Sequence, residues 1–160
     1  MSGFFNTQML ISLVTSFIAS VAFAVIFRVN KRHLILGGVA GLVTYFIYYT
    51  AEFLTGAVFI AALVSTLFTA LFSEIAARVR RAPAIVFLIA GVIPTVPGGA
   101  LYRAMRYGLE SSWELSFANL IDALLISLGI SSGILIVAIA FAVMKDKQRK
   151  RPGVNKEKGN

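Results

Sequence analysis

The chain has 160 residues, 58% of them hydrophobic, and a mean hydropathy of +0.84, which is too apolar for a soluble domain and indicates an integral membrane protein. It has no cysteine, which excludes disulfides, thiolate metal ligands and cysteine nucleophiles. The net charge of +8 does not indicate a nucleic-acid partner, because the lysines and arginines lie in short runs between apolar segments and in the tail, as the positive-inside rule expects.

Five apolar segments predict an all-α, polytopic membrane protein. They cover about Phe4–Phe27, Leu34–Leu54, Ala57–Ala77, Ala84–Tyr102 and Leu120–Met144. Residues 1–144 therefore form the predicted transmembrane domain. Residues 145–160 are basic and lack apolar periodicity, so we expect a disordered cytoplasmic tail. Its charges also suit contact with anionic lipid.

The first segment carries a stripe of small, weakly polar residues. Ser12, Ser16 and Ser20 recur every four residues, with Thr15 and Ala19 beside them, so all of them share one face of a helix. We interpret this stripe as a close helix–helix contact. A face that lines a path for a solute is the alternative.

Two GxxxG patterns allow close approach of neighbouring helices. Gly37 and Gly41 open the second segment, and Gly129 and Gly133 lie in the fifth. We expect these faces to pack against other helices, including helices of a partner subunit.

Two carboxylates lie inside or beside apolar segments. Glu74 precedes Arg78 by four residues, which favours a helical ion pair. The alternative is a proton-titrating group at the inner mouth of a pathway. Asp122, near the outer end of the fifth segment, is a second candidate for either role.

The charge distribution predicts the orientation. With five spans, the loop at 28–33, the loop at 78–81 and the tail share one side and hold 13 of the 15 lysines and arginines. The other side holds Arg103 and Arg106. This predicts an outer N-terminus and a cytoplasmic C-terminus. A re-entrant fourth segment would place the tail outside, and we reject it.

The fourth segment contains the most informative stretch, because a continuous helix there would lose two backbone hydrogen bonds. Pro94 cannot donate to the carbonyl of Ala90, nor Pro97 to that of Ile93, and two glycines follow at 98 and 99. Broken backbone at membrane depth survives only inside protein or beside a water-filled cavity. Secondary transporters bind their substrates at such breaks. The alternative is a kinked helix that serves packing alone.

A second half-helix starting after Gly98 would direct its first N–H groups toward the midplane, with Thr95 as its cap. Arg103 would lie about 7–8 Å further along the axis, with Arg106 on the same face. Such a place suits a carboxylate. We therefore assign a candidate substrate pathway; otherwise both arginines are ordinary interface anchors. The pathway residues are Pro94, Thr95, Pro97, Gly98, Gly99, Tyr102 and Arg103.

The chain offers no residues for an enzyme. It has one histidine, no cysteine, and neither a Walker loop nor an HExxH motif. Metal and nucleophilic catalysis need groups of these kinds. We expect no enzymatic activity, no cofactor and no metal site.

The order of these features resembles the threonine/serine exporter family, in particular its small YjjB-like subunit. The resemblance is carried by Phe23–Phe27, by Glu74 before Arg78, by Pro83–Phe87, by Gly91–Tyr102 and by the Gly129/Gly133 helix. It extends to about Arg151. In this family a larger half works with a half like this chain, and the resemblance implies export of threonine and serine or of a dicarboxylate such as succinate.

Our interpretation is an inner-membrane subunit of a secondary exporter, which binds small hydrophilic metabolites and works with a larger membrane subunit. The alternative is a scaffold subunit that transports nothing and stabilises its partner. A polar cavity at the break would favour the first, and dry packing there the second.

Overall fold

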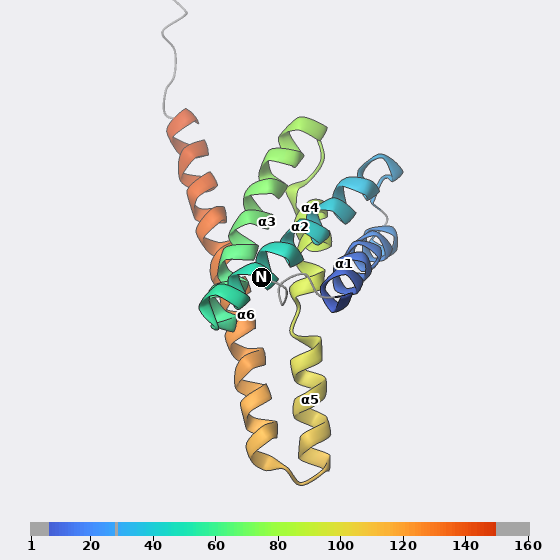
Figure 1. The fold of residues 1–160 in the computed structure, drawn as a ribbon. Coiled ribbons are helices and arrows are strands. Elements are labelled where there is room, and N and C mark those ends of the chain that lie inside the picture. Colours follow the sequence, from blue (N-terminus) through green and yellow to red (C-terminus); the bar gives the residue numbers. More distant parts are fainter. Residues whose placement is uncertain (1–6, 28, 150–160) are drawn as a thin grey trace, which may run out of the picture.

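The computed structural model describes residues 7–27 and 29–149, and this part of the chain is almost entirely helical. Its elements are α1 (Thr7–Ile26), α2 (Lys31–Thr55), α3 (Val58–Arg80), α4 (Ala84–Val92), the 3-10 turn η1 (Ile93–Thr95), α5 (Gly98–Leu109) and α6 (Trp113–Arg149) (Figure 1). Five segments are long and apolar enough to cross a membrane, and α4, η1 and α5 together form the fourth. The prediction of an all-α fold with five spans and a broken fourth span is confirmed.

Tight turns make the successive helices antiparallel. Between α2 and α3, Gly56 adopts φ +64° and donates to the carbonyl of Glu52 (2.8 Å). At the other end of α3, Arg81 adopts φ 51°, and Arg81 and Ala82 both donate to the carbonyl of Ala77. Pro83 then precedes the first residue of α4. Both turns satisfy terminal backbone groups that a membrane could not.

The interior consists of small side chains. α3 is central and packs against α2, α4 and α6, while α1 packs against α2 and α4. Its buried face is a run of alanine, serine and threonine: Ala61, Ala62, Ser65, Thr66, Thr69, Ala70, Ser73 and Ala76. The large apolar side chains mostly point outward, and Phe87 is the largest fully buried one. This arrangement suits a lipid surround, where helices associate by close packing of small residues.

All four GxxxG glycines lie in contacts within the chain. A Cβ on Gly41 would lie 1.8 Å from Ser20 Oγ, and one on Gly37 would lie 3.1 Å from Ala90 Cβ. On α6, a Cβ on Gly129 or Gly133 would meet the backbone of α3 at 2.7 or 3.1 Å. These faces are used for internal packing, so they do not offer the free surface for a partner that the sequence suggested.

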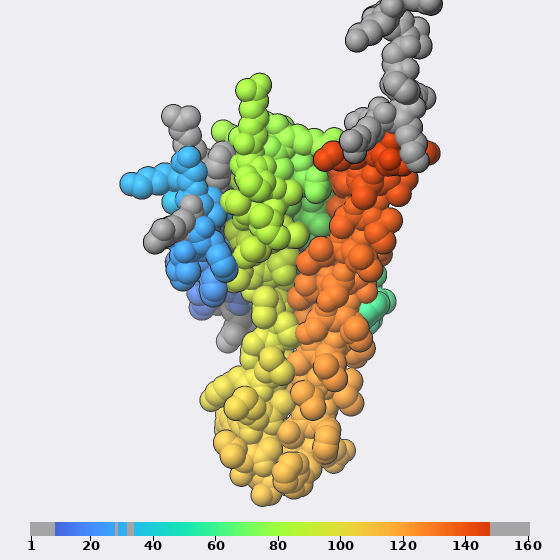
Figure 2. Space-filling model, turned by 180° about the vertical axis from the view of Figure 1, so that it is seen from behind, coloured from blue at the N-terminus to red at the C-terminus, as the bar shows by residue number. Residues whose placement is uncertain are grey.

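The polar stretch 103–119, between the fourth and fifth apolar segments of the sequence, is mostly helical. α5 continues to Leu109, and α6 begins at Trp113 rather than near Leu120, with a short turn between them. The two helices form a hairpin that projects beyond the other helices (Figures 1 and 2). Ala100 and Ala104 are buried in the hairpin, and Ser116 Oγ donates to the carbonyl of Ala104 (2.7 Å). Small residues therefore hold this hairpin together as well.

The basic end of the bundle, defined here by Lys31, Arg78, Arg80, Arg81 and Lys145, lies opposite the hairpin. α6 runs through Arg149, so the first residues of the expected tail, 145–149, are helical. Residues 150–160 lie outside the described part of the chain, and the prediction of disorder there stays a prediction.

We expect Gly41→Ala to destabilise the fold. The added methyl would collide with Ser20 and push α1 away from α2, and overpacking of this kind costs about 1–3 kcal/mol. The measurement is thermal unfolding of the purified protein in detergent. Gly98→Ala is the control, since a Cβ there meets nothing within 4 Å. Equal melting temperatures for the two variants would contradict the packing shown here.

Candidate functional site

The fourth span is interrupted and not merely bent. α4 ends at Val92, one 3-10 turn follows, and Val96 is extended (φ −59°, ψ 131°) before α5 begins at Gly98. Val96 N donates to the carbonyl of Ile93 (3.2 Å). In a continuous helix this carbonyl would accept from residue 97, but Pro97 has no backbone N–H. Gly98 N donates to Val96 O (2.8 Å), and Leu101 N to Pro97 O (3.1 Å). Local turns thus satisfy several of the backbone groups that the prolines and the break would leave free.

An open cavity of about 280 Å³ lies beside the break. Its walls come from α1, from Tyr45 of α2 and from the 3-10 turn, and four of the lining side chains carry a hydroxyl group. The lining residues are Ser12, Thr15, Ser16, Ala19, Tyr45, Ile93 and Pro94. Thr15 Oγ1 donates to the carbonyls of Ile11 and Ser12, so its lone pairs still accept hydrogen bonds. The hydroxyl groups therefore give the cavity a partly polar lining.

The serines of the α1 stripe therefore lie in two different surroundings. Ser20 makes the predicted close contact, where it packs against Gly41. Ser12 and the buried Ser16 line the cavity, which is the alternative that the sequence left open for this face.

Only part of the predicted pathway reaches this cavity. Pro94 lines it, whereas Thr95 is buried and its Oγ1 donates to the carbonyl of Val92 (2.8 Å). Thr95 does not cap α5; Pro97 is the N-cap and makes no side-chain capping bond. The expected cap is wrong because the 3-10 turn directs the hydroxyl back toward α4. Outside the cavity, Pro97 is half-buried, and Gly98, Gly99 and Tyr102 are exposed.

Arg103 and Arg106 do not act together. Arg103 Nε donates to Asn119 Oδ1 (2.8 Å) across the hairpin, and Asn119 Nδ2 donates to the carbonyl of Leu115. Arg106 instead forms an exposed ion pair with Glu110 on its own helix (2.9 Å). Arg103 is therefore held in place by a neighbouring helix, and Arg106 is a surface residue.

Arg103 also lies near carboxylates from two other helices. The charges of Asp122 on α6 and Arg103 on α5 act on the carboxylate of Glu52 at the end of α2, although no ion pair of 4.0 Å or less joins these three described side chains. We call Glu52, Arg103 and Asp122 the mouth cluster; it carries one positive and two negative charges. The charges of the cluster also act on Tyr48, whose ring stacks on Tyr45 of the cavity (6.5 Å between ring centroids). Through this aromatic pair, α2 contributes both to the cavity and to the surroundings of the cluster.

Sequence reasoning assigned no role to Glu52, because it lies at the end of a span beside a turn. The available signal was its position four residues after Tyr48 in a helix, which places the two on one face.

The predicted ion pair of Glu74 and Arg78 does not form in the described part of the chain. The guanidinium of Arg78 lies over the ring of Phe141 on α6, 4.8 Å from its centroid. The half-buried Glu74 lines a small pocket of about 50 Å³ with Ser73 of α3 and residues of α4 and α6. A cation–π contact across helices has replaced the local pair, and the carboxylate faces the pocket.

Comparisons with known proteins give one match. A family model described as "Threonine/Serine exporter, ThrE" matches residues 12–140, which include the cavity, the break and the mouth cluster. No curated protein and no solved structure matches the chain. Among the described residues, no three His, Asp or Glu side chains are grouped as a metal site would require.

The cavity can be tested with cysteines, since the natural chain has none. We expect Ser12→Cys to react with a charged, membrane-impermeant maleimide, because water enters a polar cavity and allows thiolate formation. Two controls should react poorly: Ala62→Cys, which is fully buried, and Ile18→Cys, which is exposed on an apolar helix face. Labelling of Ser12→Cys no faster than of Ala62→Cys would mean that the cavity is dry. Labelling of intact cells from outside also tests the orientation.

Proposed function

The chain belongs to the threonine/serine exporter family, and from this premise we propose that it is a subunit of a secondary exporter for small zwitterionic amino acids such as threonine and serine. Its membership and its five apolar spans make it a multi-pass membrane protein of transporter type. The observation that carries the finer proposal is the mouth cluster of Glu52, Arg103 and Asp122 beside a hydroxyl-lined cavity.

The charges of the cluster favour an amino acid over a dicarboxylate. A zwitterion carries a carboxylate that pairs with a guanidinium and an ammonium group that pairs with carboxylates. The cluster supplies Arg103 for the first, and Glu52 and Asp122 for the second. A dicarboxylate such as succinate would bring two negative charges toward two more, and like charges placed together cost several kcal/mol. Hydroxyl groups in the cavity suit the side chains of serine and threonine.

The proposed route runs from the break to the mouth cluster. Pro94 and the hydroxyls of α1 line the cavity, Tyr45 and Tyr48 connect it to the cluster, and Arg103 lies at the exit. A broken helix beside a polar cavity is the arrangement by which secondary transporters expose backbone groups to a substrate. A scaffold subunit that transports nothing would not need this cavity, so the scaffold alternative is less favoured.

We propose that a larger subunit of the same family completes the pathway. α6 has 37 residues and is about 55 Å long, whereas the hydrocarbon layer is about 30 Å thick. The projecting hairpin exposes large side chains such as Leu109, Trp113 and Phe117. A protein partner on this apolar face would cover them. Amino-acid transport by the purified chain alone in liposomes would contradict the need for a partner.

The proposed location is a bacterial cytoplasmic membrane, with the basic end in the cytoplasm and the N-terminus and hairpin outside. The mouth cluster then faces the outside, as the exit of an exporter should.

Glu74 is our candidate for a proton-titrating group near the cytoplasmic side. Its carboxylate lines a pocket that has room for water, and Arg78 points away from it. We expect Glu74→Gln to retain membrane abundance and to reduce export driven by a pH gradient at least tenfold, while exchange of substrate without a gradient persists. Equal loss of gradient-driven export and exchange would show that Glu74 acts in some other way. Unchanged export would exclude a role for Glu74 in transport.

The break itself is tested by replacing Pro94 and Pro97 together by alanine. Helix propensity favours the change by about 3 kcal/mol per proline, so α4 and α5 should merge into one helix and the protein should reach the membrane normally. We expect export to fall at least tenfold, because the cavity wall changes. Pro83→Ala, before α4, is the control. Normal abundance together with normal export in the double variant would mean that the break is only a kink.

The charge pattern of the mouth cluster predicts which residues matter. Arg103→Gln removes a charge-assisted contact of about 1.5–3 kcal/mol and should lower threonine export roughly 10- to 100-fold. Arg106→Gln is the matched control and should have little effect, because Arg106 pairs with Glu110 on the surface. The measurement is threonine efflux at matched membrane abundance, with the partner co-expressed. Equal effects of the two variants would contradict a role for Arg103 in binding.

A further inference from the structure

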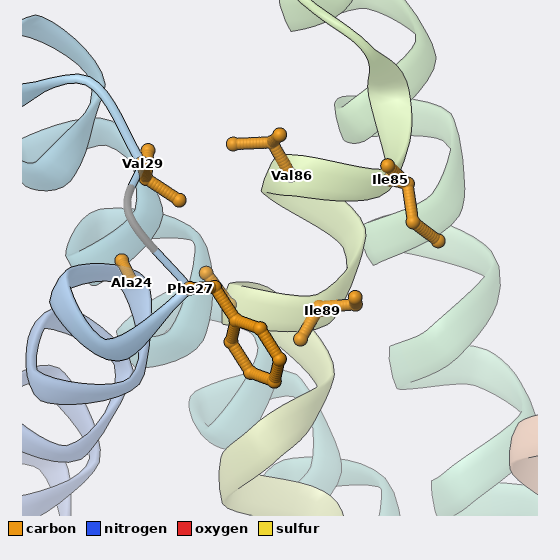
Figure 3. A pocket seen from close by; sticks show the side chains of 7 residues that line it. Ala24, Phe27, Val29, Ile85, Val86 and Ile89 are labelled. Carbon is orange, nitrogen blue, oxygen red and sulfur yellow. The ribbon is translucent and has the colours of Figure 1, made fainter.

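A second pocket lies at the basic end, away from the proposed export route. It has a volume of about 170 Å³ and lies between the C-terminal end of α1 and the first turns of α4 (Figure 3). All seven lining side chains are apolar: Ala24, Phe27, Val29, Ile85, Val86, Ile89 and Ala90. The cavity at the break is lined by the opposite end of α1 and by the turn after α4, so the two sites are separate.

The lining excludes the export substrate as the occupant. No side chain of the pocket can donate or accept a hydrogen bond, and burial of an ammonium or carboxylate group without a partner is costly. Phe27 and Ile85 are more than half exposed, so the pocket opens on the outer surface of the helices and not into the core. An apolar chain lying along that surface is the ligand that matches it.

Basic residues lie close in sequence to the lining residues on both sides of the pocket, and we call Lys31, Arg80 and Arg81 its rim. Lys31 is exposed and lies two residues after Val29, at most about 7 Å away along the backbone. On the other side, Arg80 and Arg81 are exposed at the end of α3, and Ile85 follows Arg81 by four residues. No aspartate or glutamate occurs in the sequence segments 24–33 and 78–90, which hold both the lining and the rim. The rim therefore favours an anionic group, and arginine in particular suits phosphate.

We propose that this pocket is a binding site for an anionic phospholipid, with one acyl chain between Phe27 and Ile89 and the phosphate at Lys31 and Arg81. Basic groups beside helices at a cytoplasmic surface recognise such headgroups. The proposal does not depend on the transported substrate, since it uses neither the cavity nor the mouth cluster. A lipid bound here would contact the first turns of α4, the helix that ends at the break.

The test measures lipid binding to the purified, delipidated protein by native mass spectrometry. Phosphatidylglycerol and phosphatidylcholine with identical acyl chains are compared at equal concentration. We expect at least fivefold higher occupancy by phosphatidylglycerol. The double variant Lys31→Ala/Arg81→Ala should abolish the preference, whereas Lys147→Ala, an exposed lysine on α6, should retain it. Ile89→Trp should fill the pocket and reduce the binding of both lipids, whereas Leu128→Trp, exposed on α6, should not.

A second measurement keeps the test valid if Ile89→Trp fails to fold. The chain has a single tryptophan, Trp113 on the hairpin, so Trp113→Phe combined with Phe27→Trp places one fluorophore at the pocket. Phosphatidylglycerol with brominated acyl chains should quench it at a lower mole fraction than brominated phosphatidylcholine. Equal binding and equal quenching by the two lipids would overturn the proposal. It would also be overturned if the Lys31/Arg81 variant kept the preference as fully as Lys147→Ala does.

Discussion

The structure depends on two missing backbone N–H donors in the fourth span, at Pro94 and Pro97. In an apolar medium every backbone group needs a partner, and a continuous helix with two prolines three residues apart would leave two carbonyls without their donors. The chain responds with a 3-10 turn, an extended residue at Val96 and a new helix at Gly98. α5 then leaves the bundle with α6, so the hairpin, the position of Arg103 and the cavity beside Pro94 all follow from this interruption.

Close packing of small residues holds the bundle around the break. Gly91, at the end of α4, faces Thr69 of α3; a Cβ there would lie 2.5 Å from Thr69 Cγ2. Thr69 and Thr44 share a hydrogen bond of 2.6 Å between their hydroxyl groups, which ties α3 to α2. Such contacts replace the hydrophobic effect as the source of helix association in lipid. They join α2, α3 and α4 around the break.

The two ends of the molecule carry different chemistry. The basic end has exposed cations and an apolar pocket, which suits an anionic lipid surface. The opposite end combines two carboxylates and one guanidinium from three helices, which suits a zwitterion. Both arrangements follow from the antiparallel course of the chain, because it returns charged span ends that are distant in sequence to the same side of the membrane.

The sequence alone determined the class, the five spans, the break and the family, because hydropathy, proline geometry and a motif of adjacent residues are local properties. It also drew attention to Pro94, which lines the cavity, and to Arg103, which bonds to Asn119 across the hairpin; their role in transport stays a prediction. The tertiary structure decided which neighbour each side chain meets. Ser12 and Ser16 line a cavity, although their spacing equals that of Ser20, which packs against Gly41. The guanidinium of Arg78 lies over the ring of Phe141 and does not pair with Glu74, and Glu52 lies near the charges of Arg103 and Asp122. The sequence could not show these neighbours, because they come from other helices. Periodicity defines the face of a helix, but only packing decides what lies opposite that face.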